Sequence, residues 1–260
     1  MSAPSDAELL EHLVATRIAG DIGTSRSSNV DNIDKMLADD PNYHFGVTRD
    51  RDWTPASVLA VLAARAGLDP SPARRTGADR IDPALTLAGL DAAASRIASA
   101  AHEKARVLIA TGHPTGLLSL YLPVAAALEA AGCTLLMPAD GRSMPGIGQR
   151  PKWIRYAGPV ACLGTAADLV HSHRAEPMRA MLAALAAAGA APPDLVIADH
   201  GWAGAAADAG VDTIGFADSN DPGLFIAAEQ GLPITVVPLD DNIIATTVYL
   251  PLAARLLSLL

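Results

Sequence analysis

Three segments of similar build, LVIAD (residues 195–199), TIGFAD (213–218) and ITVVPLDDN (234–242), decide the fold of this 260-residue chain. Each is a short apolar run, rich in β-branched residues, that ends in acidic side chains. Successive runs start about twenty residues apart, which leaves room for one crossover helix, so the spacing predicts a β-α-β-α-β unit. Unbroken apolar runs are typical of parallel strands, because both faces of a parallel sheet are buried.

The acidic residues that end these runs are candidates for a ligand site. In an open parallel sheet, ligands bind outside the carboxyl ends of the strands, where Asp199, Asp218 and the pair Asp240–Asp241 would emerge. Neighbouring strands lie about 4.8 Å apart, so carboxylates at equivalent heights come within reach of one cation. Further polar residues add to this edge, namely His200, Asn220 and Asn242.

A structural role for the aspartates is the alternative. Asp and Asn commonly follow strands because they suit turns and helix N-caps. Asp221 stands directly before Pro222, and proline is favoured at the first helical position, so we expect Asp221 to be a cap. Three acidic strand ends in succession nevertheless favour a metal-binding or polar active site over capping alone.

Composition narrows the class of protein. Half of the residues are apolar and 4% are aromatic, which predicts a core of Ala, Leu, Val and Ile. The net charge of −9 argues against a nucleic-acid partner, because no basic stripe is available to neutralise phosphates. Cys133 and Cys162 lie in apolar runs and are expected to be buried thiols. Without a signal peptide or an apolar run that spans a bilayer, we expect a cytoplasmic protein with no membrane partner.

Residues 1–103 are expected to form a helical region that packs on a sheet domain of residues 104–260. Ser5 with Glu8 predicts a capping box for the first helix. The pairs Thr54-Pro55 and Asp82-Pro83 predict the starts of two later helices. A second short helix is expected after a polar loop at 24–29, and an exposed loop is expected at 67–81.

The sheet domain is predicted to be α/β, with a Rossmann-like, mostly parallel sheet flanked by helices. Strands are expected at 106–110 and 133–137, and an antiparallel pair at 154–156 and 160–163. Residues 138–151 form a Gly/Pro-rich loop, long enough for a lid or a binding loop. Helices are expected at 117–131, 176–188 and 246–260.

The turn TGHPTG (residues 111–116) lies where a phosphate-binding loop belongs, between a strand and a helix. It matches neither the P-loop nor the dinucleotide pattern G-x-G-x-x-G. His113 in this turn would face the same edge as the aspartates, and the alternative is a histidine of a surface turn. The residues expected to bind phosphate here are Thr111, Gly112, Thr115 and Gly116.

Other polar residues are candidates for substrate binding. The alternation in HSH places His171 and His173 on one side of an extended chain, and such pairs bind Zn²⁺ or Mn²⁺. The amino-terminal region is expected to roof the site, with Arg17 or Arg26 reaching an anionic group and Asn29 nearby. Lys152 and Arg155 beside Trp153 could bind an anion or lie on a solvated strand edge. A serine nucleophile lacks support, because no G-x-S-x-G motif is present.

Five motifs together resemble an actinobacterial family described simply as "phosphatase". They are TGHPTG (111–116), HSHRAEPM (171–178), DLVIADHGWAG (194–204), GFADSNDP (215–222) and PLDDN (238–242). The resemblance covers most of the chain, including TRIAGD (16–21), and implies hydrolysis of phosphate esters without assigning residues. The Asp- and Asn-rich edge is also similar in style to the metal-dependent damage-control phosphatases (DUF89), whose Lys-Gly-Gln-Gly-Asn motif is replaced here by Asp-His-Gly-Trp (199–202).

These patterns predict a divalent-metal-dependent phosphatase that acts on a phosphate monoester of a small metabolite, such as a sugar phosphate, a nucleotide or a biosynthetic intermediate. Mg²⁺ or Mn²⁺ would be held by Asp218, Asn220 and Asp240 or Asp241, with His113, Asp199 and His200 as catalytic groups. Two alternatives stay open: a non-catalytic protein that binds nucleotides or sugar phosphates, and a non-phosphate hydrolase or isomerase using His113 and Asp199. The sequence also leaves a homodimer open.

Overall fold

The three acidic-ended runs are neighbouring parallel strands of one sheet, as their spacing predicts. In the computed structural model, which describes residues 3–244 and 246–260, they form β8 (Leu195–Asp199), β9 (Thr213–Ala217) and β10 (Ile234–Pro238). β8 pairs with β9 and β9 with β10, in parallel and without a register shift. Helices α7 (His200–Asp208) and α8 (Pro222–Glu229) make the two crossovers. Every residue of β8 and β9 is buried, which explains why these runs lack polar alternation.

The remaining strands extend the sheet on the other side of β3 (Arg106–Ala110). Its main path is β10-β9-β8-β3-β6-β5, with β4 (Thr134–Leu135) beside β3 and β7 (Leu169–Val170) beside β6. The predicted antiparallel pair is confirmed as β5 (Trp153–Ala157) and β6 (Val160–Gly164). The chain leaves β3 towards β4 and β6 and later returns to its opposite side as β8. At such a reversal of direction a ligand crevice is expected, here at the carboxyl ends of β3 and β8.

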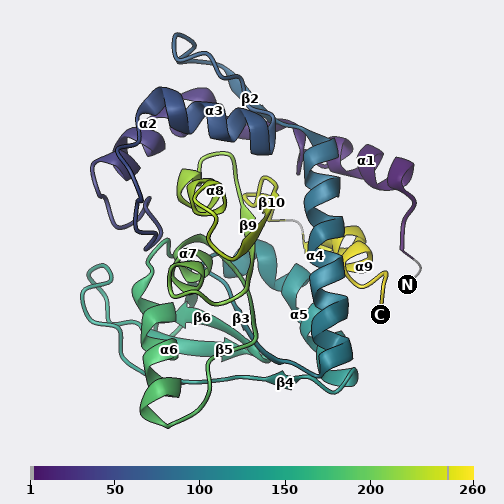
Figure 1. Ribbon diagram of the computed structural model, residues 1–260, viewed down its shortest axis with the longest axis vertical. Coiled ribbons are helices and arrows are strands. Elements are labelled where there is room, and N and C mark those ends of the chain that lie inside the picture. Colours follow the sequence, from purple (N-terminus) through teal and green to yellow (C-terminus); the bar gives the residue numbers. More distant parts are fainter. Residues whose placement is uncertain (1–2, 245) are drawn as a thin grey trace.

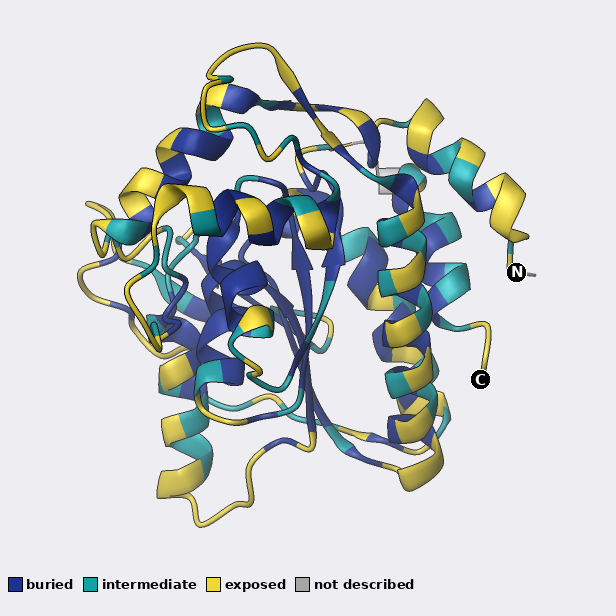
Figure 2. Ribbon diagram, turned by 45° about the horizontal axis from the view of Figure 1, so that its top comes forward, coloured by how far each residue is buried: buried dark blue, intermediate teal, exposed yellow. Residues whose placement is uncertain are grey.

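Helices cover both faces of the sheet (Figure 1). One face carries α1 (Asp6–Ala15), α4 (Pro83–Glu103), α5 (Pro114–Ala130) and α9 (Leu250–Leu256). The other carries α2 (Arg26–Leu37), α3 (Pro55–Ala66), α6 (Glu176–Ala187), α7 and α8. Along β3, Val107 and Ile109 join the first core whereas Leu108 and Ala110 join the second, as the period of a strand requires. Figure 2 shows the buried strands between helices that expose only their outer sides.

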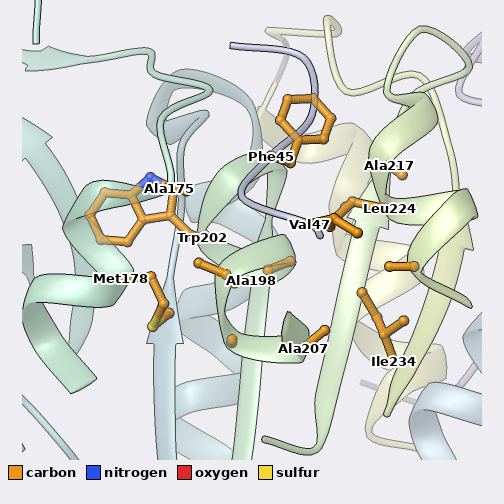
Figure 3. Close-up of a cluster of buried hydrophobic side chains, with 14 of the residues drawn as sticks. Phe45, Val47, Ala175, Met178, Ala198, Trp202, Ala207, Ala217, Leu224 and Ile234 are labelled. Carbon is orange, nitrogen blue, oxygen red and sulfur yellow. The ribbon is translucent and has the colours of Figure 1, made fainter. Parts of the chain in front are cut away.

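The second core reaches from α6 across α7 to the strand ends. Figure 3 shows Trp202 of α7 beside Met178 and Ala175, with Phe45 and Val47 of an amino-terminal loop packed over the same helix. Trp202 and Phe45 are fully buried. Since α7 begins at His200, this packing fixes the helix that starts at the crevice.

Local signals set the starts of several helices as predicted. Ser5 and Glu8 form the capping box of α1, and Thr54 caps α3 with Pro55 in its first turn. Asp82 accepts a hydrogen bond from the N–H of Ala84 at the start of α4. These polar contacts satisfy amide groups that a helix start leaves without a partner.

The amino-terminal region is not purely helical, which corrects the prediction for residues 1–103. β1 (Gly20–Ser25) and β2 (Ala78–Ile81) form a two-stranded antiparallel sheet. The expected polar loop at 24–29 is the end of β1 followed by the first turn of α2, which Ser25 caps. The expected loop at 67–81 ends in β2, because the N–H of Arg26 donates to Gly77 and its guanidinium pairs with Asp79.

Three element boundaries also differ from prediction. The strand expected at 133–137 shortens to β4, and Pro138, which has no N–H to donate to a sheet, follows it closely. α5 begins at Pro114, three residues before the predicted start, since proline fits a first helical turn. The helix expected at 246–260 divides into a 3₁₀ helix, η1 (Thr246–Tyr249), and α9, where Pro251 lies in the first turn.

Both hydrophobic cores contain residues from each side of position 103. Leu9 and Ile22 join one core with Leu117, and Ile33 and Val58 join the other with residues of α7. The division of the chain at residue 103 stays a prediction. Cys133 and Cys162 are buried free thiols, and none of the described helices has the length and apolarity needed to cross a membrane.

Candidate functional site

The carboxyl ends of β3, β8, β9 and β10 bring four short segments together at the crevice. The segments are 111–113 after β3, 199–200 after β8, 218–221 after β9 and 240–242 after β10. A fifth segment, 171–173 between β7 and α6, adds the HSH histidines. The shared edge that the acidic strand ends predict is therefore present, and it carries imidazoles as well as carboxylates.

The polar side chains of these five segments form one cluster with two halves. One half consists of carboxylates. Asp218, Asp240 and Asp241 offer oxygen atoms that all lie within 4.8 Å of one another, and all three residues are buried. The Thr24 hydroxyl donates to Oδ2 of Asp218 at 2.6 Å, and the N–H of Gly23 donates to Oδ2 of Asp240 at 2.9 Å. β1 thus supplies donors to two of the three carboxylates and covers this side of the cluster.

The other half consists of imidazoles. His113 stacks on His171 with ring centroids 4.3 Å apart, and His173 stacks on His200 at 4.5 Å. The rings of His171 and His173 lie 4.7 Å apart, so the HSH alternation does place both on one side of the chain. Phe45 closes this half, with its ring 5.7 Å from that of His200 in an edge-on arrangement.

His200 connects the two halves. Its Nε2 lies 3.5 Å from Oδ2 of Asp241 and 3.6 Å from Oδ2 of Asp221. Its Nδ1 lies 2.6 Å from Oδ1 of Asp199. The backbone of His200 has a φ of 47°, an unfavourable left-handed conformation that persists only where its surroundings hold it, and such residues concentrate at functional sites.

Asp199 fixes the orientation of the His200 ring. Its carboxylate accepts the N–H of Gly112 at 2.7 Å and the hydroxyl of Tyr121 at 3.0 Å, in addition to its contact with His200. The side chain of Asp199 accepts no hydrogen bond from the amides of α7, so it is not a side-chain cap. Its contacts orient the imidazole of His200 with Nε2 towards Asp221 and Asp241.

The imidazoles differ in their affinity for protons because their surroundings differ. Burial would lower the pKa of His200, but the carboxylates of Asp221, Asp199 and Asp241 raise it to about 10. Desolvation by the groups packed around them and the neighbouring imidazoles lower the pKa of His171, whose side chain is partly open to solvent, to about 4 and that of His173 to about 2. The last two rings are thus neutral near pH 7 and have nitrogen lone pairs available for a ligand.

The carboxylates repel one another. Burial and the charges of Asp240, Asp241 and Asp221 raise the pKa of Asp218 well above its usual value. Burial also raises the pKa of Asp221, to about 7, against the opposing effect of His200. Such repulsion between buried carboxylates is relieved by a cation or by a proton.

Several buried atoms of the cluster have no hydrogen-bond partner among the described residues. They are Oδ1 of Asp221, Oδ2 of Asp241 and Nδ1 of His113, the last lying 3.3 Å from Asp241 without hydrogen-bond alignment. A buried polar atom without a partner is costly, and carboxylate oxygens and imidazole nitrogens are metal ligands. The donor set therefore fits a divalent cation.

The turn TGHPTG packs against the protein's own backbone. A Cβ on Gly112 would lie 2.3 Å from the carbonyl oxygen of Ser172, and one on Gly116 would lie 2.6 Å from that of Asp241. The N–H of Gly112 donates to Asp199, and that of His113 donates to the hydroxyl of Thr111. The glycines thus place the segments carrying His171 and Asp241 against β3 and α5. The amide of Gly112, which was expected to face phosphate, binds a protein oxygen instead, as does the amide of His113.

The sequence comparisons identify the family of the chain. A family model described as Phosphatase matches residues 4–260. The chain belongs to the Phosphatase family. It is 43% identical over 256 residues to "Phosphatase SCO2771" of Streptomyces coelicolor, an alignment that covers 98% of this chain and 96% of that protein. The resemblance of the motifs to a phosphatase family is therefore confirmed, while the similarity to DUF89 proteins stays a prediction.

Not every predicted residue lies in the cluster of this Phosphatase family member. Arg17 is exposed and donates to the carbonyls of Asp21 and Ile22. Arg26 is fully buried, and its guanidinium binds Asp79 and two backbone carbonyls. The guanidinium group of Arg17 thus binds β1, and that of Arg26 binds β2. These structural contacts explain why the region that covers the site contains both arginines.

The predicted polar residues near the cluster have supporting contacts. Asn220 donates to Ser28 of α2, and its place beside Asp218 is taken by Asn242, whose amide donates to Oδ2 of Asp218 at 3.1 Å. Asn29 binds Asp79 and Ser219, and Thr115 is exposed in the first turn of α5.

Sequence reasoning missed two kinds of site residue. Asp221 occupies the N-cap position of α8, but its side chain makes no capping bond and instead accepts the N–H of Asp218 and faces His200. The dipeptide Asp-Pro looks the same in sequence whether the aspartate caps a helix or faces a site. Thr24 lies in β1 and Tyr121 within α5, outside the segments that directly follow the strands of the main sheet, and no local pattern marks them.

The family member's cluster opens to solvent at His171. His171 is exposed, whereas His113 and His200 are buried. An open hollow of about 360 Å³ lies there, between the loop before β5 and the HSH segment. It is lined by Asn42, Ile147, Lys152, His171, His173 and Arg174, among others.

Proposed function

We propose that this chain is a divalent-metal-dependent phosphatase that hydrolyses a phosphate monoester of a small metabolite. Its membership of the Phosphatase family supports phosphatase activity. The observation that carries the metal dependence is the set of fully buried, unpartnered oxygens on Asp221 and Asp241, next to His200 and among further carboxylates. Mg²⁺ or Mn²⁺ suits such oxygen-rich donors.

The residues proposed to hold the metal are Asp218, Asp240, Asp241, Asp221 and His200. When bound, a divalent cation supplies positive charge that neutralises phosphoryl oxygens and makes water more acidic. The protein's part is to fix the donors. Thr24 and Asn242 orient Asp218, and Asp199 orients His200.

His113 is proposed to give a proton to the leaving oxygen. Its ring lies between Asp241 and His171, and His171 lies at the open side of the cluster. A histidine in such a position donates and accepts protons without backbone movement. Asp199 was predicted to be catalytic, but its three protein partners support a positioning role instead.

The substrate is proposed to enter through the hollow at His171. This hollow is large enough for a small metabolite, and Lys152, which has no ion pair among the described residues, gives its lining positive charge. Lys152 donates to the carbonyl of Ile147, whereas Arg174 pairs with Glu176. A phosphate monoester, which is doubly charged near neutral pH, is favoured by such a lining over a neutral ligand.

Release of inorganic phosphate from a panel of phosphorylated metabolites tests this proposal. Chelator-treated protein should be inactive, and Mn²⁺ or Mg²⁺ should restore turnover. Asp218→Asn should abolish the restored activity, while Asp208→Asn at the far end of α7 should keep it. Full activity after removal of metal would exclude metal dependence, and binding without turnover for every compound would favour a non-catalytic phosphate-binding protein.

A further inference from the structure

We propose that the cluster binds two divalent cations, with the carboxylate of Asp241 shared between them. The inference rests on the proposed metal dependence and adds the number of ions and the donors of each. It comes from the arrangement of the donors, from the balance of buried charge and from the difference in chemistry between the two halves.

The first ion would be held by oxygen atoms alone. Asp218, Asp240 and Asp241 each contribute a carboxylate oxygen to a group whose atoms lie within 4.8 Å of one another. Asp218 and Asp240 are held in place by donors from β1 and by Asn242, which leaves their remaining lone pairs free for a ligand.

The second ion would be held by a nitrogen and two oxygens. His200, Asp221 and Asp241 form another group within the same 4.8 Å limit. A third group consists of His113, His171 and His200, so imidazoles surround this position as well. Asp241 is the member common to the carboxylate group and the mixed group, and its Oδ2 lacks a hydrogen bond.

The buried charge favours more than one cation. Asp218, Asp221, Asp240 and Asp241 are four carboxylates with almost no solvent exposure. Among the described residues, the ion-pair partners of this set are His113 and His200 and include no arginine or lysine. With all four ionised and both imidazoles neutral, one divalent cation would leave two negative charges at buried positions, whereas two cations neutralise all four.

The two positions differ in the metals they favour. Oxygen donors suit Mg²⁺ and Mn²⁺, whereas a site with imidazole also suits Zn²⁺ and Co²⁺. The carboxylate of Asp199 binds Nδ1 of His200. A carboxylate hydrogen-bonded to the second nitrogen of a ligating imidazole raises the basicity of the imidazole and fixes its orientation. Mn²⁺ fits both donor sets and is the probe for a test.

Isothermal titration of chelator-treated protein with Mn²⁺, together with native mass spectrometry, measures the number of ions. We expect two equivalents per chain. Because a shared carboxylate brings two ions within about 4 Å, the electron paramagnetic resonance spectrum should show exchange coupling between them. Asp240→Asn and Asp221→Asn should each leave one equivalent and remove the coupling, whereas the matched control Asp208→Asn should keep both.

The wild-type titration decides the question even where a variant fails to fold. One equivalent, with metal-dependent activity intact, would overturn the two-ion inference and leave the proposed function standing. Two equivalents without exchange coupling would exclude Asp241 as a shared ligand. No binding of Mn²⁺, with phosphatase activity that survives chelation, would overturn both the inference and the metal-dependent function.

Discussion

Oδ1 of Asp199 lies 2.6 Å from Nδ1 of His200, although the two residues are adjacent in sequence and His200 has a left-handed backbone. The conformation turns the imidazole back towards the strand end, and the carboxylate holds it there. The same carboxylate accepts the N–H of Gly112 and the hydroxyl of Tyr121. One buried acid therefore ties β3, α5 and β8 to the imidazole that joins the two halves of the site.

Asp199→Asn should weaken metal binding rather than abolish it. Asparagine lacks the negative charge that orients and polarises His200. Substitution of a residue that hydrogen-bonds to a metal ligand typically lowers metal affinity by about 10- to 100-fold. Titration with Mn²⁺ measures the effect. Tyr121→Phe, which removes one of the donors to Asp199, should give a smaller loss, and Tyr156→Phe, whose hydroxyl binds Pro138, should give none. An unchanged affinity in Asp199→Asn would contradict the positioning role.

Thr24→Val should destabilise the protein by about 1–3 kcal/mol, the usual cost when a buried acceptor loses its donor. The Thr24 hydroxyl is buried and donates to Asp218, so valine leaves that carboxylate one donor short. Urea unfolding of chelator-treated protein measures the loss. Thr48→Val is the matched control, because Thr48 also binds a carboxylate, that of Asp208, but at the surface. Equal effects in the two variants would argue against a special role for Thr24.

The sequence predicts which edge of the sheet carries the site, because the sequence signals for that edge are local and repeated. Apolar runs that end in acid, at the spacing of a crossover helix, place Asp199, Asp218 and Asp240 at neighbouring strand ends, where the structure has them. The HSH alternation likewise predicts a shared side for His171 and His173. Such features depend on the period of a strand and on its direction, and both can be read without knowing the rest of the fold.

Features that depend on long-range contacts could not be predicted in this way. β1 is short, contains glycine and pairs with a strand more than fifty residues later, so nothing local distinguishes it from a loop. Asp221 has the sequence of a helix cap, and only the position of His200 gives its side chain another partner. Arg26 looks like a loop arginine until Asp79 is brought beside it.

Arg26→Met should destabilise the fold while leaving substrate affinity almost unchanged. The pair Arg26–Asp79 is fully buried, and removal of one member of such a pair typically costs about 3–5 kcal/mol, because the other charge stays without a partner. Chemical unfolding and KM are the two measurements. Arg17→Ala, at the surface, should change neither. A rise in KM without loss of stability would instead restore Arg26 to anion binding.

His113→Ala should lower kcat by about 100-fold, the usual contribution of a general acid, while the protein still binds Mn²⁺. The expected result follows from the place of His113 between Asp241 and the exposed His171. Turnover at saturating substrate and the number of bound Mn²⁺ ions are measured on the same sample. His102→Ala, at the exposed end of α4, is the control. Loss of one Mn²⁺ equivalent together with activity would make His113 a metal ligand instead of the proton donor.

Mn²⁺ should stabilise the wild-type protein, and Asp218→Asn should reduce that stabilisation. A ligand at 100 times its Kd contributes about 2.7 kcal/mol, and one kcal/mol shifts the Tm of a chain of this size by about 2–4 °C, so we expect a rise of roughly 5–10 °C. In chelated protein, Asp218→Asn should change stability by less than about 1 kcal/mol, because relief of repulsion from Asp240 and Asp241 offsets the lost hydrogen bond from the N–H of Ser219. Thermal unfolding of both proteins, with and without Mn²⁺, gives the four values needed. A large loss of stability in the chelated variant, with an undiminished Mn²⁺ shift, would show that Asp218 serves the fold and not the metal.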